Sequence, residues 1–303
     1  MPVRTARQAE RARRSRVLLG LAAMLLAHPA AAAVLPPSFA LPKPFVRIGV
    51  GPAGGSVWQG LIPDRSLPEL RRPSVVYLPP HMTAGTRYAV LYLLHGFRGS
   101  PWQFSAGLDL AALADRAIAS GTVRPFIAVA PPAGLTSAYD GEWAGPWEHY
   151  LVSDVVPWVG AHLPAARTRA GRAIAGLSAG GFGAVDIGLR HPRLFGTLEA
   201  WSGYFRPFRD GPFRHADRHR LAAHDPSLLV RRKAPLLRRL GTRFYLSCGT
   251  RDRKTAALAF TFAGELDLLR LPHRLNLAPG GHNGRFWRSQ LPPALRYALP
   301  PAA

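Results

Sequence analysis

The 303-residue chain contains one cysteine, Cys248, and only 17 acidic residues. A single thiol excludes an internal disulfide bond, so the stability of the fold must come from packing. Lysines and arginines number 39, which gives a formal net charge of +22, and only three of them are lysines. Apolar residues make up 48% of the chain, enough for a sizeable buried core.

This excess of positive charge does not indicate a nucleic-acid partner. Arginines are not clustered with aromatic residues, and no known nucleic-acid-binding motif is present. The densest basic patch, residues 231–233 with 238 and 239, is expected on a solvated face that contacts, if anything, an anionic cell envelope. The sequence also shows no metal-binding cluster, P-loop or dinucleotide fingerprint, so we expect neither a metal nor a cofactor.

The first residues have the composition of an export signal. Six arginines lie between residues 4 and 16, the apolar run Val17–Ala27 follows, and Ala30–Ala33 offers small residues for cleavage. The run is well short of the roughly 20 apolar residues that span a bilayer. We therefore predict a signal peptide over residues 1–33 and a secreted or envelope location. The pair Arg13-Arg14 leaves the choice between the general and twin-arginine export routes open.

Strand and helix patterns alternate along the remainder of the chain. Apolar runs predict strands over 57–62, 73–77, 88–94, 125–130, 172–177, 196–201, 243–248 and 274–277. Helical spacing is found over 108–119, 150–163, 179–190, 256–271 and 286–299, the last bent or broken at Pro292-Pro293. This alternation predicts an α/β fold whose mostly parallel sheet carries helices on both faces.

We expect residues 34–303 to form one domain, interrupted by an insertion over about 204–240. This segment is rich in Arg, His, Pro and Asp, and is predicted to lie over the edge of the sheet. It could serve as a lid or as the wall of an acyl pocket, or it could be a surface excursion without a function.

The most informative motif is Gly176-Leu177-Ser178-Ala179-Gly180, which follows a predicted strand and precedes a predicted helix. A Gly-x-Ser-x-Gly pentapeptide in this context is typical of a nucleophile elbow, a tight turn that exposes the serine hydroxyl. The backbone amide of Ala179 can then face a developing oxyanion. Ser178 is accordingly the predicted nucleophile.

A serine hydroxyl needs a base, and the base needs a carboxylate that orients it. His282 lies in Gly280-Gly281-His282-Asn283 directly after the last predicted strand, where the base is expected. Asp252 follows the strand over 243–248 and is the predicted acid. Glu265 and Asp267, on the next helix, remain alternatives.

The loop after the strand 88–94 is expected to supply the second amide of the oxyanion hole, and Phe97 is our choice for it. His95 in the same loop precedes the nucleophile in the chain, so it is expected to brace the loop. Cys248 is interpreted as a small buried residue rather than a nucleophile.

Five motifs in this order resemble the putative-esterase branch of the α/β-hydrolases, which includes feruloyl and enterochelin esterases, S-formylglutathione hydrolases and mycolyltransferases. They are Val76–Pro80, Leu91–Gly96, Gly176–Gly181, Cys248–Asp252 and Gly280–Asn283 with Trp287. The resemblance implies an α/β-hydrolase fold, a triad of Ser178, Asp252 and His282, and an oxyanion hole formed by Phe97 and Ala179.

The leading hypothesis is a secreted serine esterase that acts on a small-molecule or carbohydrate-linked carboxylic ester. The alternative is an acyltransferase of mycolyltransferase type, in which an alcohol replaces water as the acceptor. In that subgroup the acid lies later in the chain, which keeps Glu265 under consideration. A non-catalytic envelope-binding protein is the third hypothesis, but it would be expected to carry a damaged triad.

Overall fold

In the part of the chain that the computed structural model describes, residues 39–64, 72–134 and 143–301, nine strands form one sheet. The signal peptide predicted over residues 1–33 lies outside these ranges. The strands are β1 (Val46–Val50), β2 (Ser56–Gly60), β3 (Ser74–Leu78), β4 (Ala89–Leu94), β5 (Phe126–Ala130), β6 (Arg172–Leu177), β7 (Thr197–Trp201), β8 (Arg243–Gly249) and β9 (His273–Ala278).

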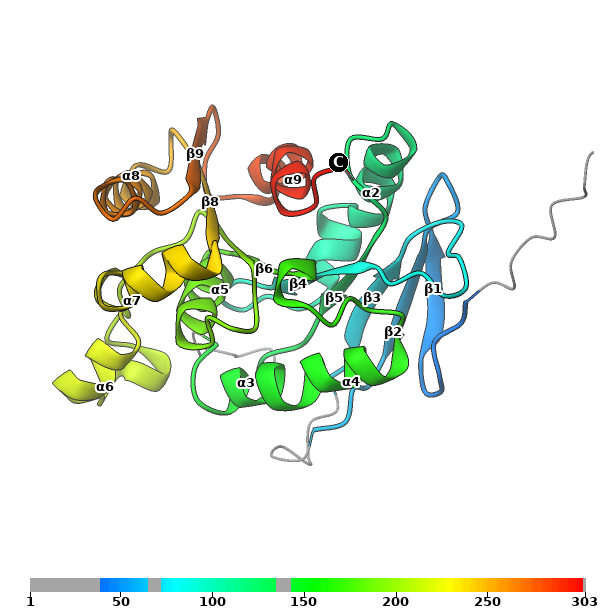
Figure 1. Cartoon of the computed structure of the whole chain (residues 1–303), viewed down its shortest axis with the longest axis horizontal. Coiled ribbons are helices and arrows are strands. Elements are labelled where there is room, and N and C mark those ends of the chain that lie inside the picture. Colours follow the sequence, from blue (N-terminus) through cyan, green and yellow to red (C-terminus); the bar gives the residue numbers. More distant parts are fainter. Residues whose placement is uncertain (1–38, 65–71, 135–142, 302–303) are drawn as a thin grey trace, which may run out of the picture. The chain divides into compact units, whose positions relative to one another are not determined.

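The spatial order of the strands is β1-β2-β3-β5-β4-β6-β7-β8-β9. From β5 to β9 all neighbouring strands are parallel, whereas β1, β2 and β3 join as an antiparallel extension beside β5. The carboxyl ends of the parallel strands therefore share one edge (Figure 1). This arrangement confirms the predicted mostly parallel sheet.

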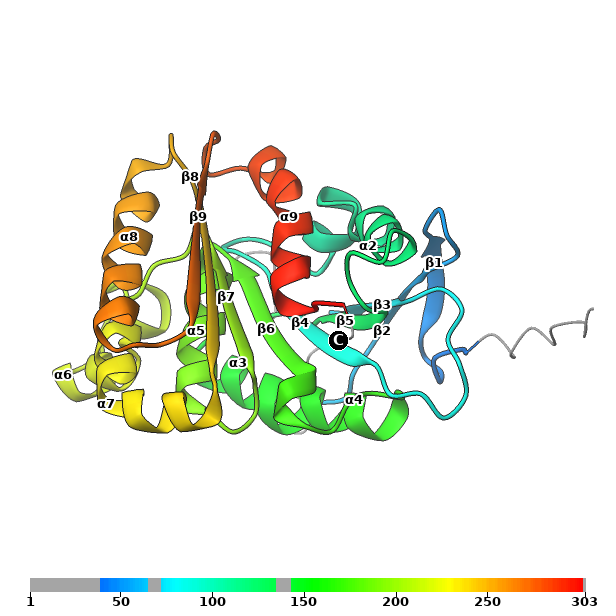
Figure 2. The same cartoon turned by 45° about the horizontal axis from the view of Figure 1, so that its top comes forward.

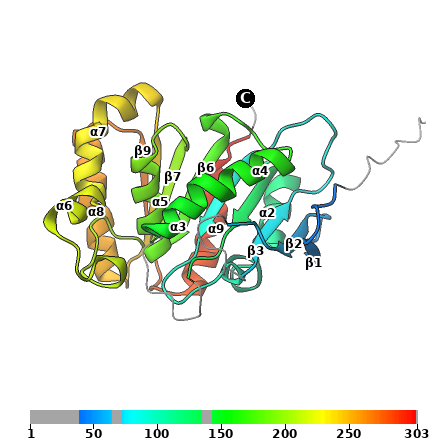
Figure 3. The same cartoon turned by 90° about the horizontal axis from the view of Figure 1, so that it is seen from below.

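Helices cover both faces of the sheet. Figure 2 shows α2 and α9 on one side of the central strands, with α5 and α8 on the other. Figure 3 looks onto the layer that contains α3, α4, α5 and α7. The helices are α2 (Leu110–Ala119), α3 (Pro146–His149), α4 (Val156–His162), α5 (Ala179–Arg190), α6 (Arg218–Ala223), α7 (Pro226–Leu240), α8 (Arg253–Leu268) and α9 (Gly284–Ala298). None of the helices in the described ranges has the length and apolar character that crossing a membrane requires.

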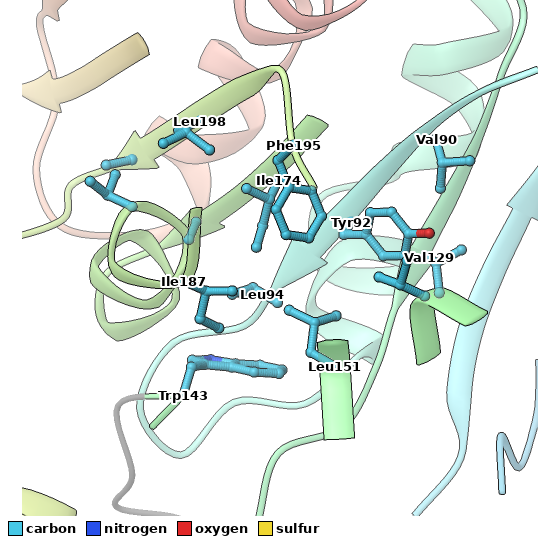
Figure 4. Close-up of a cluster of buried hydrophobic side chains, with 14 of the residues drawn as sticks. Val90, Tyr92, Leu94, Val129, Trp143, Leu151, Ile174, Ile187, Phe195 and Leu198 are labelled. Atoms are coloured by element: carbon cyan, nitrogen blue, oxygen red, sulfur yellow. The ribbon is translucent and has the colours of Figure 1, made fainter. Parts of the chain in front are cut away.

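The central strands are buried on both faces because each face meets a helix layer. Along β4, Val90, Tyr92 and Leu94 belong to one apolar cluster, and the residues between them belong to the cluster on the opposite face. Figure 4 shows the first cluster, in which Leu94, Ile187 and Trp143 lie close together. This two-sided burial explains why the strand appears in the sequence as a continuous apolar run.

The expectation for residues 204–240 was partly wrong. The segment contains α6 and α7, and α7 is the helix that connects the parallel strands β7 and β8. Only the residues before α7 depart from the alternation of strands and helices. Pro235 lies inside α7 and masked the helical pattern, although Val230 and Leu237 are fully buried along one side of the helix.

The prediction that Pro292 and Pro293 bend or break the last helix also needs correction, since α9 is continuous through both residues. The two prolines remove backbone donors, which weakens a helix. Burial of Leu291 and Leu295 against the sheet compensates for this loss.

The elbow between β6 and α5 packs directly against the end of β4. A Cβ atom added at Gly180 would lie 2.0 Å from the carbonyl oxygen of Leu94, and one added at Gly176 would lie 2.2 Å from the carbonyl oxygen of Gly180. Both obstacles are backbone atoms, so no rotation of a side chain could relieve the clash. Glycine at these positions is therefore a packing requirement of the turn.

A buried carboxyl group lies beside the elbow on β7. Glu199 is fully buried and accepts a hydrogen bond of 3.0 Å from the indole Nε1 of Trp201, the residue whose carbonyl oxygen accepts from the Ser178 amide at 2.9 Å. Burial raises the pKa of Glu199 to about 8, and the hydrogen bond from Trp201 offsets part of this rise. The folded protein therefore keeps a proton on Glu199 at neutral pH.

We expect Gly180→Ala to destabilise the protein by about 3 kcal/mol, because the new methyl group meets fixed backbone. The matched control is Gly264→Ala in α8, where a Cβ meets no atom within 4 Å. Alanine there should add about 0.5–1 kcal/mol of stability. Urea unfolding of both variants checks this prediction, and equal effects at the two sites would contradict it.

Glu199→Gln should change how stability depends on pH. Between the ordinary pKa of 4.5 and the folded value of about 8, the unfolded chain releases the proton while the folded protein retains it. This group therefore makes the free energy of unfolding fall as pH rises through that range. Glutamine removes this contribution. The free energy of unfolding of the variant should therefore rise relative to that of the wild type from pH 5 to pH 8 in denaturant titrations. A constant difference across that range would show the prediction to be wrong.

Candidate active site

Ser178 occupies the turn between β6 and α5 with φ 56° and ψ −120°, a backbone conformation that non-glycine residues rarely adopt. Its amide donates to the carbonyl of Trp201, and its own carbonyl oxygen accepts from the amides of Gly181 and Phe182 at 2.9 and 3.1 Å. These bonds hold the strained turn in place. The side chain of Ser178 then stands at the carboxyl edge of the sheet, as a nucleophile elbow requires.

His282 reaches the same point from the loop between β9 and α9. Its Nε2 atom lies 2.9 Å from the Ser178 hydroxyl, and its Nδ1 atom lies 2.6 Å from Oδ2 of Asp252. A carboxylate can only accept, so Nδ1 donates to Asp252 and leaves the lone pair of Nε2 for the serine hydroxyl. The structure thus joins the three residues that the sequence proposed.

Asp252 is held at the start of α8. Its Oδ2 atom accepts a second hydrogen bond, from the hydroxyl of Thr255, and its side chain is only 11% exposed. Two donors on one oxygen fix the direction of the carboxylate toward His282. Thr255 was not predicted from the sequence, although its place three residues after Asp252, in the first turn of a helix, is the signal that could have found it.

The alternative acids lie elsewhere. Glu265 is bound by Arg231, with Oε1 and Nη2 2.5 Å apart, and Asp267 is 76% exposed, with its Oδ1 atom 3.7 Å from Nε2 of His273. Of the carboxylates considered from the sequence, Asp252 is the one that contacts His282.

The two predicted oxyanion donors flank Ser178. Ala179 is the first residue of α5, so its amide has no carbonyl partner one turn back. The loop after β4 lies against the elbow, since a Cβ added at Gly96 would be 3.3 Å from the Cβ of Ser178. Phe97 is the next residue, and its side chain is exposed. The position of both residues is compatible with the expected oxyanion hole, whose role remains a prediction.

His95 braces the loop that carries Phe97. Its Nε2 atom accepts from the amide of Ala133 at 3.1 Å, while Nδ1 lies 3.0 Å from the carbonyl oxygen of Gly96 and donates to it. Burial lowers the pKa of His95 to about 4, despite the backbone hydrogen bond that favours protonation. The ring is therefore neutral and structural.

Residues behind the imidazole fix its position from the other side. The ring of Trp287 meets His282 edge-on at 5.0 Å, and its Nε1 atom donates to the hydroxyl of Ser202 at 3.1 Å.

Cys248 is fully buried beside Thr255, and burial raises the pKa of its thiol to about 11. The thiol is therefore protonated and unreactive near neutral pH, in agreement with the interpretation of Cys248 as a buried core residue.

Aromatic residues of α5 and of the segment after β7 pack together and reach the start of α8, where Nζ of Lys254 lies 4.8 Å from the ring of Phe208. Phe182 of α5 stacks on Tyr204 at 5.0 Å, and Tyr204 lies 4.4 Å from Phe208. Trp143 and Trp201 are likewise fully buried in the core. The 204–240 segment therefore contributes packed aromatic residues as well as basic ones.

Among the described residues, no group of three His, Cys, Asp or Glu side chains is arranged to hold a metal ion. The hydrogen-bonded atoms of the site are those of serine, imidazole and carboxylate.

Comparison with known proteins gives the same picture. The model of the family described as "Putative esterase" matches residues 68–298. An esterase of Mycobacterium tuberculosis is 33% identical over 138 residues, which cover 43% of this chain but only 29% of that protein.

Solved structures show the fold more completely. A ferulic acid esterase with 24% identity superposes with a TM-score of 0.67, covering 75% of this chain and 91% of its own. The S-formylglutathione hydrolase of Staphylococcus aureus has 18% identity and a TM-score of 0.62, covering 84% and 98%. Since the family model covers well over half of the chain, including Ser178, Asp252 and His282, the protein belongs to the Putative esterase family and has the α/β-hydrolase fold.

Proposed function

We propose that this protein is a serine esterase that hydrolyses a carboxylic ester through an acyl-enzyme on Ser178. The observation that carries the proposal is the hydrogen-bonded series from Asp252 through His282 to Ser178. Such a series lets the imidazole remove the proton of the hydroxyl, and the carboxylate stabilises the imidazolium that results. A protein that only bound an envelope component would have no need of this geometry.

In the first half of the reaction, the Oγ atom of Ser178 attacks the ester carbonyl carbon while its proton moves to Nε2 of His282. The carbonyl oxygen becomes negatively charged, and we expect the amides of Ala179 and Phe97 to donate to it. Each such donor contributes on the order of 3 kcal/mol to the stability of the transition state. The bond from carbon to the alcohol oxygen then breaks, and His282 returns the proton to the departing alcohol.

In the second half, water attacks the acyl-enzyme, with His282 taking a proton from the water and passing it to Oγ of Ser178. The His282 side chain is 40% exposed, so water has access to the base. The same access is open to an alcohol, so hydrolysis and transfer to an alcohol, the alternative considered from the sequence, share this step.

We also propose that the protein works outside the cytoplasm, in the envelope or in the medium. The support is the arginine-rich start, apolar run and small residues of the segment 1–33. The positive net charge of the protein would favour contact with anionic envelope surfaces.

Ser178→Ala should abolish labelling by a fluorophosphonate probe and reduce the hydrolysis of p-nitrophenyl esters by at least about a thousandfold. Without Oγ, no covalent intermediate can form. Gel fluorescence and ester kinetics measure the two effects. Undiminished labelling of the variant would mean that the nucleophile is another residue.

Asp252→Asn should lower kcat by at least about a hundredfold, because the amide cannot stabilise an imidazolium. Glu265→Gln serves as the matched carboxylate-to-amide control and should keep kcat within about threefold, since Glu265 contacts Arg231 instead of His282. Steady-state kinetics on one ester compares them. A larger loss of kcat in Glu265→Gln than in Asp252→Asn would mean that Glu265 is the acid.

A further inference from the structure

A hollow of about 540 Å³ lies directly behind the His282 loop. We call it the arginine hollow; its lining residues are Arg251, Pro279, Gly280, Gly281, Asn283, Arg285, Phe286 and Ser289. These residues follow the ends of β8 and β9 or lie in α9, elements that are labelled in Figure 2. The hollow therefore lies outside the hydrogen-bonded residues of the site but next to two of them.

The walls of the arginine hollow are well fixed. The amide of Arg251 donates to the carbonyl of Gly280 at 2.8 Å, which ties the turn after β8 to the loop after β9. Asn283 accepts from the amide of Phe286 at 3.1 Å, and the ring of Phe286 is buried below Gly280. Arg251 and Arg285 thus belong to two anchored segments that line one cavity.

The charges of these two arginines are not balanced within the described part of the chain. Neither guanidinium has a carboxylate or hydrogen-bond partner there, and no acidic residue lines the hollow. By contrast, Arg288, one turn further along α9 from Arg285, is paired with Asp109 at 2.7 Å. Guanidinium groups bind carboxylates and phosphates through two parallel hydrogen bonds. Two arginines that line one cavity without a partner among the described residues are therefore suited to binding an anion.

The chemistry of the site decides which half of a substrate would meet this cavity. His282 must protonate the departing alcohol, so the alcohol portion has to leave past its imidazole. The neighbours of His282, Gly281 and Asn283, line the arginine hollow, as does Arg251 next to Asp252.

We propose that the arginine hollow is a subsite for a negatively charged group on the alcohol portion of the ester, a carboxylate or a phosphate. This inference rests on the proposed esterase function and names the class of substrate for the same site. Arg251 and Arg285 would bind the anion, and the substrate would be an ester of an acidic alcohol or phenol.

The test compares kcat/KM for three acetyl esters of matched shape: those of 4-hydroxyphenylacetate, 4-hydroxyphenylacetamide and 4-hydroxybenzylphosphonate. The wild type should prefer at least one of the two anionic esters over the amide by about tenfold or more at low ionic strength. The preferred anion distinguishes carboxylate from phosphate recognition. Added salt should reduce the preference.

Arg251→Ala and Arg285→Ala should each lower this anion-to-amide ratio severalfold, and the double variant should bring it close to one. A ratio is used because any general loss of activity cancels from it. The control is Arg232→Ala, at an exposed position of α7. This variant removes the same charge but should keep the wild-type ratio.

A wild-type ratio near one, with the neutral ester still hydrolysed, would overturn the subsite while leaving the esterase proposal intact. An equal loss of the ratio in Arg232→Ala would also overturn it, because general attraction by the positive charge would then explain the preference. If no ester is hydrolysed and fluorophosphonate fails to label Ser178, the proposed function itself is wrong.

Discussion

The contact between the Ser178 turn and the backbone at the end of β4 is the constraint on which the site depends. Gly180 lies so close to the Leu94 carbonyl that no side chain fits, and the amide of Ser178 is bound to the carbonyl of Trp201 on β7. The turn is therefore fixed between β4 and β7, the two strands that flank β6. The loops after β4, β8 and β9 reach it because parallel strands end at a common edge.

The sequence predicted the site better than it predicted some of the helices. Ser178, Asp252 and His282 each follow a strand of the parallel part of the sheet, which brings such positions together whatever their separation in the chain. In contrast, α7 was missed because Pro235 and many arginines hide its apolar side. Strand β1 was missed although Val46, Ile48 and Val50 alternate along it with other residues, a pattern typical of a strand. Thr255 was not predicted, although its place three residues after Asp252 in the first turn of α8 puts its hydroxyl within reach of the carboxylate.

Carboxylates are scarce in this chain, and several are used inside the fold. Asp115 is buried and accepts from the hydroxyl of Tyr77 and the amides of Ala53 and Gly55. Glu148 binds both Arg190 and His191, and these partners hold its pKa below the ordinary value against the opposing effect of burial. With so many acids committed to internal contacts, few remain to neutralise exposed arginines. The positive charge of the surface follows from this distribution.

Acid and base of the site belong to one mechanical unit. The amides of Thr250 and Arg251 donate to the carbonyls of Ala278 and Gly280. Backbone hydrogen bonds therefore connect the segment that carries Asp252 to the segment that carries His282. Ser178, by contrast, follows β6. A small shift of β6 relative to β8 and β9 would leave the distance between Asp252 and His282 intact and would change only the distance between His282 and the Ser178 hydroxyl. Motions that break the hydrogen-bonded series should accordingly be concentrated at the contact between His282 and Ser178.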